Sequence, residues 1–398
     1  MAGHFKKASE RLASSKGTIL VLHDTTEFSF SRANPEAMGL IGNGIAQKTI
    51  RTGVRKEYIK CGVLMHASLA ITEEGLPLGQ SSTRFWSRDE FKHTTQMKRH
   101  INPTRIPIEQ KESIRCLRNL ESSTSLLTER SMDMIHIGDR ENDIYEYFCK
   151  CNELRTHFII RSCVNRLANK ASIIDEMADF KQTYCHKIKY LDKTGQEINA
   201  NLEVKSKEVE LHPPIGKQSK YEDLKVNIVS AVEKTAPKGC DRIRWTFITN
   251  LPVKNKKDII KVLEWYKKRW SIETFFKVIK SGFKAEESKL SSGEGLARLL
   301  AIDCILAWRF YWLTMLNRQA IHTDPSIAFD EVERKILQTS FKSKCSPKSL
   351  TDFLLLLTKM GGYLARKNDP PPGNIVVWRG LRKLKEIQIG FEMANICR

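Results

Sequence analysis

Two short apolar runs in the first half of the chain each stop at an aspartate. Residues 18–23 (TILVLH) are followed by Asp24, and residues 132–139 (MDMIHIGD) end in Asp139. Apolar, β-branched runs of this length are typical of buried strands. We therefore predict two strands that each deliver a carboxylate at its C-terminal end.

The segments around these runs predict a mixture of strands and helices. Residues 63–72 and 77–86, separated by EEGL, have the pattern of a hairpin that lies beside the first strand. Strands that alternate with helices are typical of an α/β fold with a mixed sheet. The other elements expected here are helices at 107–130 and in RENDIYEYFCK after Asp139, and a strand at 157–162.

The second half of the chain changes from a strand pattern to a helix pattern. Residues 180–250 alternate apolar and polar positions, with turn signals at DKTGQ, PPIGK and APKGC. This pattern predicts an antiparallel β insertion. Beyond about residue 292 the periodicity is helical, and NDPPPGN precedes a last amphipathic helix at 378–393. The chain is therefore expected to end in a helical region.

The segment YKKRWSIETFFKVIKSG, residues 266–282, has the periodicity of an amphipathic helix. A helix turns about 100° per residue, so one face, within roughly 60° of Tyr266, carries Arg269, Glu273, Lys277 and Lys280. The opposite apolar face is suited to burial and carries Ile272, Phe275, Phe276 and Ile279. The charged face is then either solvated or available for chemistry around the carboxylate of Glu273.

The charge of the chain points to a polyanionic partner. Its 398 residues include 66 Lys and Arg against 46 Asp and Glu, a formal net charge of +20, which favours nucleic acid. No apolar run is expected to span a membrane, and residues 1–17 lack the apolar segment of a signal peptide. We therefore expect a cytoplasmic protein that does not engage a membrane.

The cysteines and histidines do not have the spacing of metal ligands. The ten cysteines include no C-x-x-C, and the ten histidines include no H-x-x-x-H. We expect both sets to be mainly structural, with the cysteines reduced.

Three carboxylates are left as candidates for chemistry: Asp24, Asp139 and Glu273. Strand-end aspartates on adjacent strands lie less than about 5 Å apart in backbone spacing, and a third carboxylate completes a site for divalent cations. Such oxygen ligands suit Mg²⁺, with Mn²⁺ as a substitute, and two such ions promote attack on a phosphodiester. The neighbouring cations of residues 266–282 would then hold phosphates, and Tyr266 would offer a hydroxyl or a stacking face.

The spacing Y-x₂-R-x₃-E-x₆-K, met here by Tyr266, Arg269, Glu273 and Lys280, resembles the signature of the IS-four family of bacterial transposases. The segments HDTTEFSFSR (23–32) and GDRENDIYEYF (138–148) look like that family's first and second aspartate segments. Residues 357–392 are similar to the C-terminal dimerisation region of the Tn-five type of that family. The resemblance runs from about residue 18 to the C-terminus.

This resemblance implies an RNase-H-like catalytic core interrupted by a β insertion. Asp24, Asp139 and Glu273 would be the metal-binding DDE triad of a Mg²⁺-dependent transposase. The implied activity is cut-and-paste movement of double-stranded DNA, with hairpin formation at transposon ends and strand transfer into a target. The implied assembly is a homodimer in a paired-end complex.

The resemblance also implies two further DNA contacts and a domain organisation. Trp245 matches the family tryptophan that receives a flipped base, although a place in the core is the alternative; Arg161 matches an arginine near the DNA end, with a surface cation as the alternative. The expected parts are a catalytic core at 18–170 and 251–320, the β insertion at 171–250, and a helical dimerisation region at 321–398.

One departure from the family concerns the N-terminus. Family members carry a helical DNA-binding domain before the first aspartate, whereas 23 residues precede Asp24 here. Residues 1–17 are therefore expected to be a remnant of that domain. Two other functions stay open: a truncated, non-catalytic inhibitor that dimerises with full-length subunits, and an RNase-H-like nuclease or resolvase.

Overall fold

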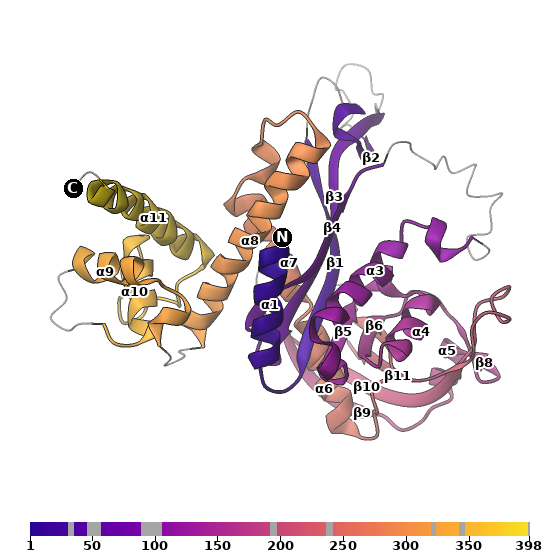
Figure 1. Cartoon of the computed structure of the whole chain (residues 1–398). Helices are drawn as coiled ribbons and strands as arrows, with labels where there is room; N and C mark the ends of the chain where they lie inside the picture. The colour runs from indigo at the N-terminus through magenta and orange to yellow at the C-terminus, as the bar shows by residue number, and fades with distance from the viewer. Residues whose placement is uncertain are drawn as a thin grey trace, which may run out of the picture. The chain divides into compact units, whose positions relative to one another are not determined.

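The chain divides into two units, which are described separately (Figure 1). The computed structural model describes residues 1–30, 36–45, 57–88, 106–191, 197–235, 242–319, 324–341 and 347–396. The sheet unit comprises Ala2–Glu73 and Gly79–Glu273, and the helical unit comprises Met1, Glu74–Leu78 and Thr274–Arg398. The finer division into core, insertion and dimerisation region stays a prediction.

The centre of the sheet unit is a mixed set of strands. β1 (Ile19–Phe30) pairs antiparallel with β3 (Glu57–Thr72) on one side and parallel with β5 (Met134–Gly138) on the other. β5 in turn pairs parallel with β6 (His157–Arg161). The predicted hairpin is confirmed, since β4 (Pro77–Trp86) pairs with β3. The mixed sheet and its helices confirm the predicted α/β fold class. This arrangement is consistent with an RNase-H-like fold.

The antiparallel strands predicted for residues 180–250 extend this same sheet. β12 (Arg244–Thr249) pairs antiparallel with β6 and joins the second half of the sheet to the first. The sheet order among the described strands is β2-β3-β1-β5-β6-β12-β11-β10-β7-β8, and β9 pairs with β10. The strands not yet delimited are β2 (Leu40–Ile45), β7 (Leu167–Ala168), β8 (Ala171–Ser172), β9 (Tyr184–Leu191), β10 (Glu197–Leu211) and β11 (Leu224–Glu233).

The first aspartate does not end its strand, which corrects the sequence prediction. β1 continues past Asp24 to Phe30, because its antiparallel pairing with β3 continues to Cys61. β5, by contrast, ends at Gly138 as predicted, and Asp139 caps the short 3₁₀ helix η4 (Arg140–Asn142). One aspartate is therefore held by paired strand backbone and the other by a turn.

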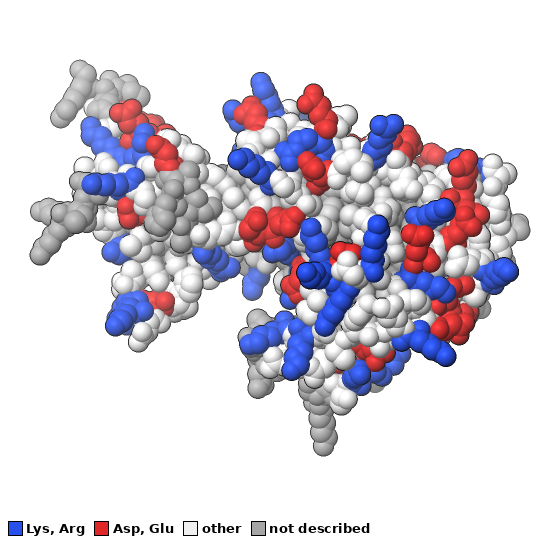
Figure 2. All heavy atoms as spheres, turned by 90° about the horizontal axis from the view of Figure 1, so that it is seen from below, with Lys and Arg blue, Asp and Glu red and all other residues white. Residues whose placement is uncertain are grey.

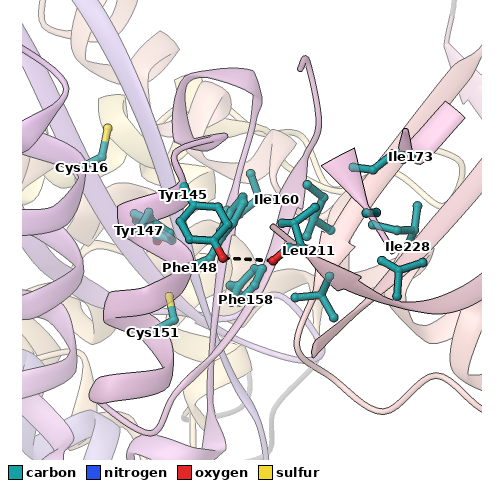
Figure 3. Packing of buried hydrophobic residues seen from close by; sticks show 14 of the residues in the cluster. Cys116, Tyr145, Tyr147, Phe148, Cys151, Phe158, Ile160, Ile173, Leu211 and Ile228 are labelled. Atoms are coloured by element: carbon teal, nitrogen blue, oxygen red, sulfur yellow. Dashed lines mark hydrogen bonds between the residues drawn. The ribbon is translucent and has the colours of Figure 1, made fainter. Parts of the chain in front are cut away.

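Helices α3 (Ile114–Thr124) and α4 (Tyr145–Glu153) help to form the core of the sheet unit. Figure 3 shows part of this core, where the Tyr145 hydroxyl donates to the carbonyl of Leu211 at 3.0 Å. Phe148 and Phe158 stack with their ring centroids 4.9 Å apart. These contacts hold α4, which follows Asp139 in the chain, against the strands β6 and β10. Other helical segments of this unit are α1 (Ala2–Ser14), η1 (Glu36–Met38), η2 (Ile108–Gln110), η3 (Ser125–Asp133) and α5 (Ile173–Ala178).

The segment 266–282 is not the single helix that its periodicity predicts. α6 (Lys256–Lys267) ends after Tyr266, α7 (Trp270–Lys277) carries Glu273, and residues Val278–Gly282 form a π-helical turn. The last turn of α6 tightens, with the Lys268 amide donating to the carbonyl of Trp265 at 3.1 Å, so the helical phase is lost. The predicted apolar face is confirmed, since Ile272, Phe275, Phe276 and Ile279 are all buried.

The helical unit is built from α8 (Gly293–Arg318), α9 (Glu331–Ser340), α10 (Leu350–Met360) and α11 (Asn374–Ile396), with the turns η6 (Ala285–Glu287) and η7 (Pro325–Ile327). α10 and α11 share a buried apolar cluster with α8 and α9. The predicted C-terminal helices are therefore confirmed, and the last one is longer than 378–393.

α8 corrects the expectation that no segment could span a membrane. It is long and apolar enough to do so by length and composition, with a mean hydropathy of 1.5 over 18 residues, and half of that window is buried inside the protein. Leu313 and Leu316 of α8 belong to the core of the helical unit. A helix that packs apolar residues into a core passes the same test as a membrane span.

Candidate active site

The three predicted carboxylates all lie in the sheet unit. Asp24 lies within β1, Asp139 follows β5, and Glu273 lies in α7 at the end of this unit. The parallel register pairs Leu22 with Ile137, so two residues further on Asp24 and Asp139 are level on neighbouring strands. Neighbouring strands are about 4.8 Å apart, which brings the two aspartates side by side.

Arg269 joins the first and third carboxylates. Its Nη1 donates to Asp24 Oδ2 at 3.0 Å, and its Nη2 donates to Glu273 Oε1 at 2.6 Å. The Arg269 side chain is only 12% exposed. Burial alone would lower the pKa of Arg269, but Tyr266, Asp24 and Glu273 raise it above its ordinary value. Arg269 is therefore a permanent cation between two acidic side chains.

The surroundings of Asp24 change its ionisation. Burial raises the pKa of Asp24 to about 6, Arg269 opposes this rise, and the charges of Asp139 and Glu273 add to it. The effect of Asp139 and Glu273 on Asp24 shows that the three groups share one electrostatic environment. A buried carboxyl with a raised pKa beside other acidic groups is typical of sites that bind cations or transfer protons.

Thr25 and Glu141, which the sequence did not single out, connect the two aspartates. The Thr25 amide donates to Asp24 Oδ1 at 2.8 Å, and its hydroxyl donates to Glu141 Oε2 at 2.7 Å. The Glu141 amide donates to Asp139 Oδ1 at 2.9 Å, and Arg115 Nη2 donates to Glu141 Oε2 at 2.8 Å. The only available sequence signal was their position next to the two aspartates.

The acidic donor set has the chemistry of a Mg²⁺ site. Carboxylate oxygens are the ligands that Mg²⁺ and Mn²⁺ prefer, and Asp24, Asp139 and Glu273 supply them. Among the residues that the structure describes, no group of three or more His, Cys, Asp or Glu side chains is close enough to hold a metal ion. The guanidinium of Arg269 supplies the positive charge instead, between Asp24 and Glu273.

Tyr266 lies beside Arg269, and the predicted residues Trp245 and Arg161 lie near Tyr266. Tyr266 lies with its ring 4.4 Å from that of Phe247 and 6.0 Å from that of Trp245, measured between centroids. Burial raises the pKa of Tyr266 above its ordinary value, and the neighbouring charges of Arg269 and Arg161 oppose this rise. The prediction that Tyr266 lies on a free polar face is wrong: it is only 6% exposed, because α6 ends there and the ring packs under β12.

Trp245 and the two lysines have different surroundings. Trp245 is half-buried on β12, with its ring in contact distance of Phe247 and Tyr266, so a core role and a base-stacking role both stay open. Lys277 is exposed at the end of α7, and Lys280 is half-buried in the π-helical turn. Both lysines belong to the helical unit, whereas the other predicted site residues belong to the sheet unit.

Comparison with known protein families gives a match to part of the chain. Residues 137–308 match the family model described as the transposase DDE domain. The matched segment contains Asp139, Arg269 and Glu273, whereas Asp24 lies before it. The match supports a DDE transposase, a protein that acts on DNA as a polynucleotidyl transferase and belongs to a class that generally uses divalent metal ions.

Proposed function

We propose that the protein is a transposase of the IS-four family, Tn-five type, which moves DNA by a cut-and-paste route in the bacterial cytoplasm. The observation that carries this proposal is that Arg269 pairs with both Asp24 and Glu273, while the charge of Asp139 adds to the raised pKa of Asp24. The family match over residues 137–308 supports the same class of reaction. The proposed substrate is double-stranded DNA at transposon ends and at the target site.

The proposed mechanism divides the work between the carboxylates and the cations. Asp24, Asp139 and Glu273 would hold Mg²⁺, or Mn²⁺ in its place, which activates the attacking water or hydroxyl and stabilises the leaving oxygen. Arg269 offsets part of the negative charge of the site before DNA arrives and is placed to bind a phosphate when its carboxylate partners engage a metal. Tyr266 orients Arg269, since the guanidinium carbon lies 6.0 Å from the centre of its ring.

The neighbouring aromatic and basic side chains suit a DNA end. Trp245 would stack on an unpaired base during hairpin formation, and Arg161 would contact phosphate beside it. Lys277 and Lys280 would hold the DNA backbone. In Figure 2 basic side chains, interspersed with acidic ones, are scattered over the face shown, and such cations can contact phosphates. Pairing of two ends would take place in a homodimer.

The test removes each carboxylate separately. Asp24→Asn, Asp139→Asn and Glu273→Gln should each lower cleavage at least about a thousandfold, because loss of one ligand removes the charge that holds the metals. The substrate is a pre-nicked duplex taken from the DNA that flanks the gene, with Mg²⁺ or Mn²⁺. Glu153→Gln, at an exposed ion pair with Lys150 in the same unit, is the matched control.

The outcomes separate the candidate functions. Near-normal cleavage by one of the three variants removes that residue from the site, and normal cleavage by all three contradicts the proposal. Wild-type protein that binds DNA and dimerises but cleaves with neither metal would favour the inhibitor function instead.

A further inference from the structure

Two buried histidines join the strands that carry the aspartates. His23 Nε2 and His136 Nδ1 are 2.8 Å apart, and both side chains are fully buried. His23 directly precedes Asp24 on β1, and His136 lies three residues before Asp139 on β5. We call this contact the His23–His136 bridge.

The surrounding hydroxyl groups fix the direction of every hydrogen bond in the bridge. The Thr124 hydroxyl donates to the carbonyl of Leu120 at 2.9 Å, so it can only accept from His136 Nε2, which is 3.1 Å away. A neutral His136 then accepts at Nδ1, which makes His23 Nε2 the donor. His23 Nδ1 must in turn accept from the Ser68 hydroxyl at 2.9 Å.

The hydrogen bonds that lead to the Ser68 hydroxyl agree with this direction. Asn119 Nδ2 donates to Ser68 Oγ at 3.0 Å, and Ser82 Oγ donates to Asn119 Oδ1 at 3.0 Å. Each proton in the series has a single acceptor, and both histidines carry their proton on Nε2. The series therefore connects α3, β3, β1 and β5 without a charged group.

The position of the bridge relates it to the aspartates. Backbone pairing between β1 and β5 ends with Leu22 opposite Ile137, just before the two carboxylates. The His23–His136 bridge joins β1 and β5 at this same end of their backbone pairing. A directional bond resists sliding of one strand along the other, whereas contacts between apolar side chains tolerate it. A buried polar pair is often no more stabilising than an apolar one, so stability alone does not explain two histidines here.

We propose that His23 and His136 are positioning residues that hold Asp24 and Asp139 at the spacing needed for the catalytic metal ions. This inference rests on the proposed function. His66 is not part of the bridge, since its Nδ1 hydrogen-bonds with Thr25 Oγ1 at 2.9 Å and its ring only stacks on that of His23, 6.2 Å away between centroids.

The test compares variants that keep or lose the bridge. His136→Phe preserves a ring of similar size but removes the acceptor for His23, whereas His136→Asn keeps an acceptor oxygen near the position of Nδ1. Tyr147→Phe is the control, because the Tyr147 hydroxyl is buried without a hydrogen-bond partner in the described structure and its ring lies 6.2 Å from that of His23. Mn²⁺ binding by the DNA-free protein is measured by electron paramagnetic resonance, with melting temperature and cleavage recorded in parallel.

We expect His136→Phe to raise the Mn²⁺ concentration for half-saturation at least about tenfold, the effect typical of groups that orient metal ligands. His136→Asn should stay within about threefold of wild type, and Tyr147→Phe should be unchanged. A lower melting temperature with unchanged Mn²⁺ binding in His136→Phe would show that the bridge is structural only and would overturn the inference.

Two further measurements keep the inference falsifiable if the phenylalanine variant does not fold. Histidine ¹⁵N spectra of the wild-type protein should show His23 and His136 as neutral Nε2–H tautomers, and an Nδ1–H tautomer at either position would overturn the inference. Asp24→Asn serves as the reference for metal binding. If it does not weaken Mn²⁺ binding, the proposed metal site itself is wrong; if it does and His136→Phe does not, only the positioning role is wrong.

Discussion

At the scale of single residues, the site depends on the balance of charge around Asp24. Burial raises the pKa of this carboxyl to about 6 even though Arg269 is hydrogen-bonded to it. One guanidinium shared between two carboxylates does not fully compensate for their burial beside Asp139. The apo site is therefore strained electrostatically in a way that a divalent cation would relieve.

This imbalance predicts a pH-dependent effect of Asp24→Asn on stability without metal. The pKa of Asp24 is raised from 3.8 to about 6 in the folded state. The protonated Asp24 carboxyl therefore stabilises the fold fully below pH 3.8, and this stabilisation is lost as the pH rises through 6. The free energy of unfolding of Asp24→Asn minus that of wild type should grow by about 1 kcal/mol between pH 5 and pH 8. Urea unfolding in the presence of a chelator measures it.

The control for this prediction is Asp133→Asn, at a partly exposed ion pair with Arg130. Its difference from wild type should change little over the same range. A flat difference for Asp24→Asn would mean that Asp24 ionises like a carboxyl in water.

At the scale of secondary-structure elements, the sequence predicted most of what local pattern determines. The strand that stops before Asp139 was predictable because its apolar run stops there. The continuation of β1 past Asp24 was not, since it depends on twelve paired positions with β3, distant in the chain. The break after Tyr266 was missed because burial of that ring against Phe247 is a tertiary effect that overrides a regular periodicity. Thr25, Glu141 and the buried histidines act through partners that only the fold brings near.

The packing of α10 against α11 gives a prediction at this scale. A Cβ atom at Gly380 of α11 would lie 2.1 Å from the carbonyl oxygen of Leu357 in α10, which is a severe clash with backbone. Gly380→Ala should therefore push the helices apart and destabilise the helical unit by about 2 kcal/mol. Thermal unfolding followed by circular dichroism would measure the loss.

Gly390 provides the matched control in the same helix. A Cβ atom there meets nothing within 4 Å, so Gly390→Ala should stabilise by up to about 1 kcal/mol through helix propensity alone. Equal effects of the two substitutions would contradict close packing at Gly380.

At the scale of the whole molecule, the net charge of +20 is the property most relevant to DNA. Contacts with the phosphate backbone release counterions, so their contribution to affinity falls steeply as salt rises. Such contacts position a duplex but do not read its sequence. Overall affinity for DNA and preference for a particular DNA sequence are therefore separate properties.

We predict that affinity for a random duplex falls by about a thousandfold or more between 50 and 200 mM salt. Lys277→Gln should lower the slope of log affinity against log salt by about one, because Lys277 is exposed and proposed to contact a phosphate. Lys284→Gln, at an exposed ion pair with Glu287 in the same unit, is the control and should leave the slope unchanged. An unchanged slope for Lys277→Gln would remove that lysine from the DNA contacts.

The alternation of side chains along β1 also limits how this gene can vary. His23 lies opposite Ser68 and is fully buried, while the next residue, Asp24, lies opposite Ala67 and faces the site. Loss or gain of one codon between Ile19 and Asp24 would exchange the two faces, placing a carboxylate in the core and a histidine at the site. Variants of this gene should therefore tolerate apolar substitutions in this strand far better than one-codon insertions or deletions.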